Sequence, residues 1–117
     1  MAKLGHARLD ENENTGYGKP GDQTKKEVVE QDFYNNKTKP WVYVFRCKDS
    51  GTSKTIATYM KQACANDHIG YAQYGDPSNH FAGRYGLHYA MVTYKAFPAV
   101  EVDCNCDCSS LVSEILN

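Results

Sequence analysis

The cysteine residues constrain the fold of this chain more than any other feature. There are five of them, an odd number, and three are crowded into Cys104-Asn-Cys106-Asp-Cys108. A fully paired disulfide framework is therefore impossible within one chain, at least one thiol stays free, and a reducing compartment fits the sequence. The 117 residues must instead fold around one modest hydrophobic core. We expect residues 1–117 to form a single domain or the N-terminal part of one.

Charge and hydropathy exclude several classes of partner. The formal net charge is −1, from 13 basic and 14 acidic side chains, so no positive field favours nucleic acid or an anionic membrane surface. No apolar run approaches the roughly 20 residues of a membrane span, and the N-terminus lacks the apolar stretch of a signal peptide. We therefore expect a protein made in the cytoplasm, with no nucleic-acid or membrane partner and with no cofactor.

The first 40 residues are expected to be loop-rich, because glycine and polar residues dominate without a sustained period of two or 3.6. The glycine-rich stretch 16–21 lacks phosphate-loop spacing, and we interpret it as one wall of a site. Trp41-Val-Tyr-Val-Phe45 follows a proline and predicts a buried strand. A helix is predicted from Ser53, as N-cap, to about Asn66, with an apolar face of Ile56, Ala57, Met60, Ala63 and Cys64.

The second half of the chain gives one ambiguous element and one clear helix. Residues 71–77 are expected to be a turn-rich link. Residues 79–96 fit a helical stripe, although 88–94 also fit a strand, and we favour the helix. A last helix is predicted after the cysteine cluster, with an apolar face of Leu111, Val112, Ile115 and Leu116.

The start of that last helix points to thiol chemistry. Asp107 is available as its N-cap, which places Cys108 in the first turn, where free backbone N–H groups stabilise a thiolate. The same N–H groups can hold the oxyanion of a tetrahedral acyl intermediate. This position makes Cys108 a candidate nucleophile, and its alternative role is that of a small buried hydrophobe. Cys104 and Cys106 are expected to be packing residues or resolving thiols.

Asp107-Cys-Ser-Ser-Leu-Val112 resembles the Asp-Cys-Ser-Gly-Leu-Val nucleophile motif of NlpC-type, papain-like cell-wall cysteine peptidases. The longer pattern, with Gly21-Asp-Gln-Thr24, Pro40-Trp41 and Ile69-Gly-Tyr71, is similar to phage-encoded peptidoglycan hydrolases. The resemblance implies an α+β fold in which helices pack on a small antiparallel sheet. It also implies that Tyr71 lines the oxyanion side of the site and that the chain is incomplete, ending after the nucleophile helix.

The resemblance leaves the general base open. In the family the histidine follows the cysteine, whereas only nine residues follow Cys108 here. The chain is then a fragment, or another chain supplies the histidine, or an upstream histidine acts in a permuted arrangement. Of the upstream histidines, His88 is the preferred candidate, because Leu87-His-Tyr-Ala-Met-Val92 resembles the strand that carries the family's histidine, and His6 ranks below it.

Taken together, the sequence predicts a phage-derived lysin whose Cys108 cuts stem peptides of bacterial peptidoglycan. It would be made in the host cytoplasm and act at the cell wall. The alternative from another class is a non-catalytic wall-binding or phage structural module that retains the cysteine motif. A third possibility is a small metal-binding protein that uses the three clustered cysteines and a histidine. A homo-oligomer or a second chain that completes the sheet is also compatible with the sequence.

Overall fold

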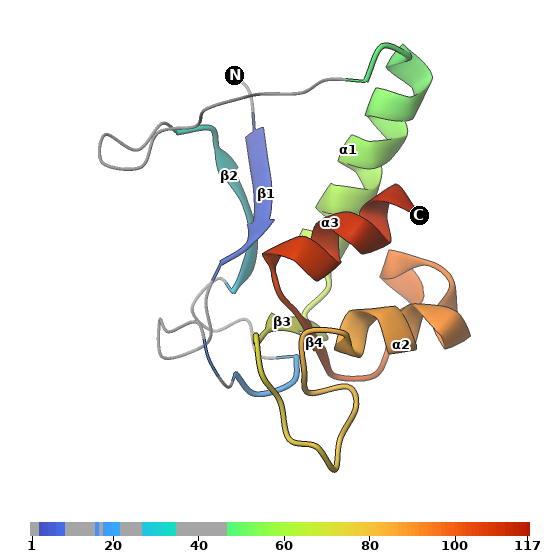
Figure 1. Ribbon diagram of the computed structural model, residues 1–117. Coiled ribbons are helices and arrows are strands. Elements are labelled where there is room, and N and C mark those ends of the chain that lie inside the picture. The colour runs from blue at the N-terminus through green and yellow to red at the C-terminus, as the bar shows by residue number, and fades with distance from the viewer. Residues whose placement is uncertain (1–2, 9–15, 17, 22–26, 35–46) are drawn as a thin grey trace.

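The computed structural model of the chain describes residues 3–8, 16, 18–21, 27–34 and 47–117. Within these residues, three α-helices and a short 3₁₀ helix combine with two small sheets (Figure 1). This confirms the predicted α+β fold class. The strand predicted at 41–45 lies outside the described residues.

The first sheet lies in the segment that was expected to be loop-rich. Strand β1, Lys3–Ala7, pairs antiparallel with β2, Val28–Asp32, so that Gly5 lies opposite Glu30. Each strand has only five residues, and its partner is remote in sequence. The sequence of such a short strand shows little alternation of apolar and polar residues, because pairing and burial rather than intrinsic preference stabilise it.

Helix α1, Ser50–Ala65, packs against this sheet. The close approach requires Gly5, since a Cβ there would lie 2.1 Å from Cγ of Met60. The helix begins four residues before the predicted start, because Asp49 rather than Ser53 is the N-cap and its Oδ2 accepts from the amide of Thr52 at 2.7 Å. A carboxylate at an N-cap accepts a stronger, charge-assisted hydrogen bond than a hydroxyl does. The predicted end at Asn66 is confirmed.

The second sheet is parallel, which the sequence did not indicate. Strand β3, Ile69–Tyr71, pairs with β4, Cys104–Cys106, in a register that places Tyr71 opposite Cys106. Parallel strands need a crossover connection, and here it contains helix α2, Gly86–Tyr94, and the 3₁₀ helix η1, Phe97–Ala99. The helical interpretation of 79–96 is thus confirmed for 86–94, whereas 79–85 form turns.

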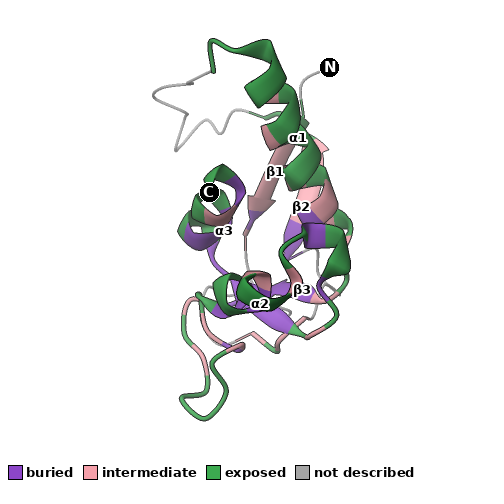
Figure 2. Cartoon of the chain, turned by 90° about the vertical axis from the view of Figure 1, so that its right-hand side faces the viewer, coloured by how far each residue is buried: buried purple, intermediate pink, exposed green. Residues whose placement is uncertain are grey.

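The core lies where both sheets meet the helices. Figure 2 shows buried residues gathered around β3, α2 and the inner side of α3, while the outer face of α1 is exposed. Helix α3, Cys108–Leu116, contributes Leu111 and Ile115 to this core. Ala7 at the end of β1 belongs to the same cluster, so β1 and α3 are joined through it.

Candidate functional site

The candidate site lies where the carboxyl ends of β3 and β4 meet the start of α3. Because parallel strands run in the same direction, their ends reach the same edge of the sheet, and Tyr71 lies beside Cys106 there. The amide of Ala72 donates to the carbonyl of Cys106 at 3.2 Å, which ties the two ends together. The chain then turns into α3, so Cys108 follows this edge directly.

Cys108 is the first residue of α3 and is exposed. The predicted N-cap is confirmed: Oδ1 of Asp107 accepts from the amide of Ser110 at 2.8 Å, and the hydroxyl of Ser110 accepts from the amide of Asp107 at 2.9 Å. This reciprocal capping box fixes the first turn. It leaves the amides of Cys108 and Ser109, the first two of the helix, without an intrahelical acceptor. Such amides can bind a developing oxyanion.

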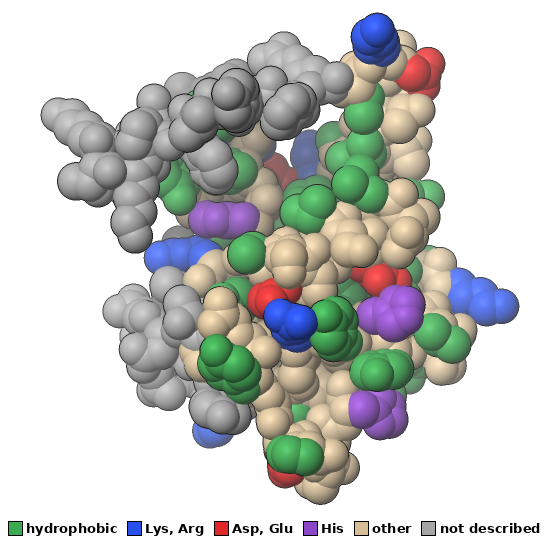
Figure 3. Space-filling model, in the orientation of Figure 1, with side chains coloured by type: hydrophobic (Ala, Val, Ile, Leu, Met, Phe, Trp, Pro, Cys, Tyr) green, Lys and Arg blue, Asp and Glu red, His purple; other side chains and the backbone are tan. Residues whose placement is uncertain are grey.

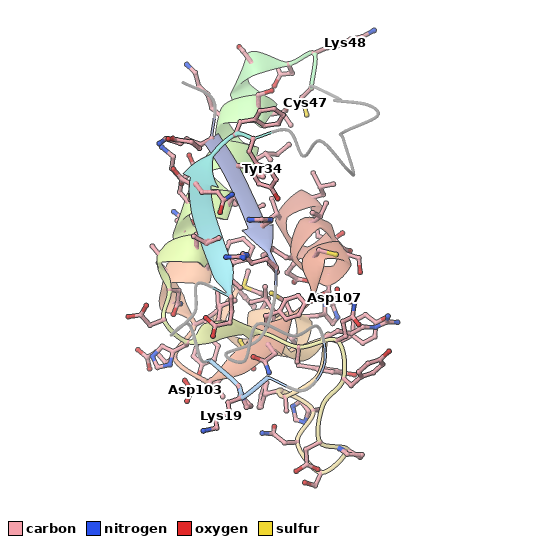
Figure 4. The ribbon with its side chains drawn as sticks, turned by 90° about the vertical axis from the view of Figure 1, so that its left-hand side faces the viewer. Lys19, Tyr34, Cys47, Lys48, Asp103 and Asp107 are labelled. Carbon is pink, nitrogen blue, oxygen red and sulfur yellow. The ribbon has the colours of Figure 1, made fainter. Side chains whose placement is uncertain are left out.

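Asp107 is held as a carboxylate at the base of the site, and Figure 4 labels it at the start of α3. Burial tends to raise the pKa of Asp107, but hydrogen bonds from the amide of Ser110 and the hydroxyl of Ser109, with help from the charge of Arg84, lower it overall. A capping carboxylate also interacts favourably with the positive end of the helix dipole. The first turn therefore keeps its geometry over the neutral pH range.

Tyr71 lies close to Cys108 despite the 36 residues between them. Burial raises the pKa of Tyr71, and the negative charges of Cys108 and Asp107 add to this effect, while a hydrogen bond with Gln73 opposes it. The phenol is thus protonated at neutral pH. The structure brings together Tyr71 and Cys108, the two residues that the motif comparison had paired.

His88 lies on helix α2 and is directed at the second half of α3. Its Nδ1 is 3.0 Å from Oε2 of Glu114, a carboxylate whose side chain is only 11% exposed. Glu114 follows Cys108 by six residues, which is about 9 Å along an α-helix. The side chain of Glu114 also leaves the helix about 120° away from that of Cys108 around the axis of α3, since successive residues of an α-helix turn by about 100°.

His6 lies on strand β1, which contacts α3. Figures 1 and 4 both show the end of β1 beside the start of α3, and the two elements are in contact. Within the described part of the chain, Nε2 of His6 is buried and has no hydrogen-bond partner. Burial lowers the pKa of His6, although a hydrogen bond with Gln31 opposes this. The imidazole is therefore neutral at neutral pH.

The other two clustered cysteines are buried in β4. Burial raises the pKa of Cys104 to about 12 and that of Cys106 well above the ordinary value. Residues two apart on a strand share a face, and both side chains belong to the core. In the structure all five cysteines are free thiols. Among the described residues there is no group of three or more His, Cys, Asp or Glu side chains that could hold a metal ion.

Asn105 lies between the two buried cysteines, and sequence reasoning did not identify it. Its side-chain amide donates to the carbonyl of Gly18 and to that of Ala82, both at 2.9 Å. It thereby joins the glycine-rich stretch and the segment before α2 to the strand that leads into Cys108. An asparagine in an otherwise apolar strand was the available signal, since a buried amide requires partners. Arg84 and Glu114 carried no signal of this kind.

A family model, described as "endolysin-like domain", matches residues 4–117. The chain belongs to the endolysin-like domain family. This membership supports a phage-lysin, peptidoglycan-related role and leaves the catalytic type open. None of the curated proteins and none of the solved structures matches the chain. Among the described helices, none is both long and apolar enough to cross a membrane.

Proposed function

We propose that this endolysin-like domain is a thiol hydrolase that cuts stem peptides of bacterial peptidoglycan, with Cys108 as its nucleophile. The observation that carries the proposal is the exposed thiol of Cys108 at the first position of a capped helix. Helix N-termini favour the thiolate, which is the nucleophilic form. The family supplies the peptidoglycan context, and the NlpC-like motif supplies the reaction class.

The reaction follows from the groups around the thiol. Sγ of Cys108 attacks a peptide carbonyl as its proton passes to an imidazole, and the amides of Cys108 and Ser109 stabilise the oxyanion. The tetrahedral intermediate collapses, the imidazolium protonates the leaving amine, and a thioester remains on Cys108. Water, deprotonated by the same imidazole, hydrolyses the thioester and regenerates the thiol. Tyr71 lines the oxyanion side and stays protonated, because burial raises its pKa.

We assign the role of base to His6, with His88 as the alternative. Three observations support His6: its strand contacts α3, its Nε2 is unpaired among the described residues, and burial lowers its pKa so that it is neutral. Catalytic hydrogen bonds often form or tighten only when substrate binds, so we expect His6 and Cys108 to come into hydrogen-bond contact in the complex. His88 instead lies against Glu114, toward the second half of α3.

The permuted order, with a histidine before the cysteine, would complete the catalytic pair within this chain. The proposed partner is the stem peptide, and the proposed place of action is the cell wall after synthesis in the host cytoplasm. Neither a metal nor an organic cofactor enters the proposed reaction.

Digestion of purified Gram-positive sacculi tests the proposal, with soluble products identified by mass spectrometry. Cys108→Ala should abolish release of stem peptides, whereas Cys47→Ala, which removes another exposed thiol, should leave it unchanged. His6→Ala should lower the rate at least about 100-fold, the usual contribution of a general base, and His88→Ala should lower it less. Equal release by the original protein and Cys108→Ala would refute the thiol mechanism. Saturable binding to sacculi without any product would favour the wall-binding alternative.

A further inference from the structure

Arg84 lies beside the nucleophile helix and has no role in the reaction described above. It is exposed, and its Nη2 donates to the hydroxyl of Tyr85 at 2.7 Å, while the guanidinium carbon lies 4.7 Å from the centroid of the same ring. Its charge acts on Asp107, the cap of α3, and its partner Tyr85 lines one pocket together with Ser110 of that helix. Figure 3 shows a basic side chain near the centre of this face, next to acidic atoms and apolar side chains.

The backbone before Arg84 is held firmly in place. Gly75 and Gly83 approach so closely that a Cβ on Gly75 would lie 2.4 Å from the amide nitrogen of Gly83. The carbonyls of Phe81 and Ala82 accept hydrogen bonds from the backbone and side-chain amides of Asn105, both at 2.9 Å. The strand that leads into Cys108 therefore also positions Arg84, and a preorganised side chain loses less entropy when it binds a ligand.

The chemistry of the guanidinium indicates what it would bind. It presents five N–H donors in a planar fork that matches a carboxylate, and Tyr85 uses one of them. Tyr85 itself is 51% exposed, so the pair faces solvent rather than the core. A carboxylate is an acceptor whose two oxygens match this fork, and a peptide bound at Cys108 could offer one to Arg84.

We propose that Arg84, oriented by Tyr85, binds a free carboxylate on the stem peptide next to the bond that Cys108 attacks. The domain would therefore prefer stem peptides whose glutamate carboxyl group is free over those in which it is amidated. This inference rests on the proposed function, because it names the substrate class of the same site.

Binding measured by calorimetry tests the preference without turnover. The protein carries Cys108→Ala, and the probes are two synthetic stem peptides that differ only in a free or amidated α-carboxyl of the γ-linked glutamate. A charge-assisted bidentate contact should favour the free acid about tenfold. Arg84→Gln should reduce this ratio to about one, and Arg84→Lys should keep part of it, because lysine retains the charge but not the fork. Lys54→Gln, which removes an exposed cation on α1, should leave the ratio unchanged.

The outcomes separate this inference from the proposed function. The role of Arg84 is overturned if the preference for the free acid survives in Arg84→Gln. It is also overturned if the protein that retains Arg84 shows no preference, or does not bind the free acid. Near-ultraviolet circular dichroism of each variant establishes that the fold is kept, and Arg84→Lys supplies a second variant with the charge retained. Failure of the proposed function would appear elsewhere, as Cys108-independent release of peptides from sacculi, while the binding ratio would still decide the role of Arg84.

Discussion

Removal of the N-cap carboxylate of α3 should destabilise the protein more than removal of the equivalent group on α1. In Asp107→Ala the amide of Ser110 and the hydroxyl of Ser109 lose their acceptor, which they contact at 2.8 and 2.9 Å. N-cap substitutions to alanine cost about 0.5–2 kcal/mol, and Asp107 is only 5% exposed, which leaves its donors poorly hydrated. We therefore expect a loss near the upper limit, about 2 kcal/mol in the free energy of unfolding.

Urea unfolding followed by far-ultraviolet circular dichroism measures this loss, and Asp49→Ala is the matched control. Asp49 likewise accepts from an amide and a hydroxyl, both of Thr52, but it is exposed, so water can replace its carboxylate and the loss should be smaller. A loss for Asp107→Ala no larger than that for Asp49→Ala would refute the reasoning from burial.

The same carboxylate should make stability depend on pH. The pKa of Asp107 is lowered in the folded protein, so its charge stabilises the fold above the unfolded value of about 3.9 and ceases to do so as pH falls through the folded value. Asp107→Asn keeps an acceptor oxygen and removes the charge. Its stability deficit should therefore be largest at neutral pH and shrink below about pH 4. A deficit that is constant with pH would show that the charge contributes nothing.

Three further predictions concern packing and thiol accessibility. Gly86→Ala should unfold the start of α2 or prevent folding, because its Cβ would lie 1.9 Å from the carbonyl oxygen of Phe81. Gly83→Ala should be tolerated, because its Cβ would have no neighbour closer than 3.8 Å, and thermal melting compares the two variants. Asn105→Asp should lower the melting temperature more than Asn105→Ala, since it places a carboxylate against two carbonyl oxygens, and the reverse order would contradict the hydrogen bonds assigned to Asn105. Alkylation by iodoacetamide, mapped by mass spectrometry, should modify the exposed thiols of Cys47 and Cys108 first. The half-buried thiol of Cys64 and the buried thiols of Cys104 and Cys106 should react much later, because burial raises their pKa values.

The features that the sequence could predict depend on contacts between near neighbours in the chain. Helix α3 and its cap follow from Asp107 and the apolar spacing after it, and the end of α1 at Asn66 follows from the loss of periodicity. Tyr71 was linked to Cys108 only through a motif, and the parallel pairing of β3 with β4 explains how they meet.

The features that it could not predict depend on remote partners. Strand β1 is stabilised by β2 and by α1, which approaches through Gly5, and none of this is visible in five local residues. His6 ranked below His88 for the same reason, because its proposed role as base rests on the contact of β1 with α3, two elements that are remote in the chain. Arg84 gains its position from the hydrogen bonds of Asn105 to the preceding backbone.

Capture of the covalent intermediate tests the central claim most directly. The protein is mixed with soluble stem peptides, quenched in acid within seconds, and analysed by intact-mass and peptide-mapping mass spectrometry. The account predicts a thioester adduct on Cys108 that is absent from Cys108→Ala and is released by hydroxylamine. Peptide cleavage without an adduct, undiminished in Cys108→Ala, would contradict the account.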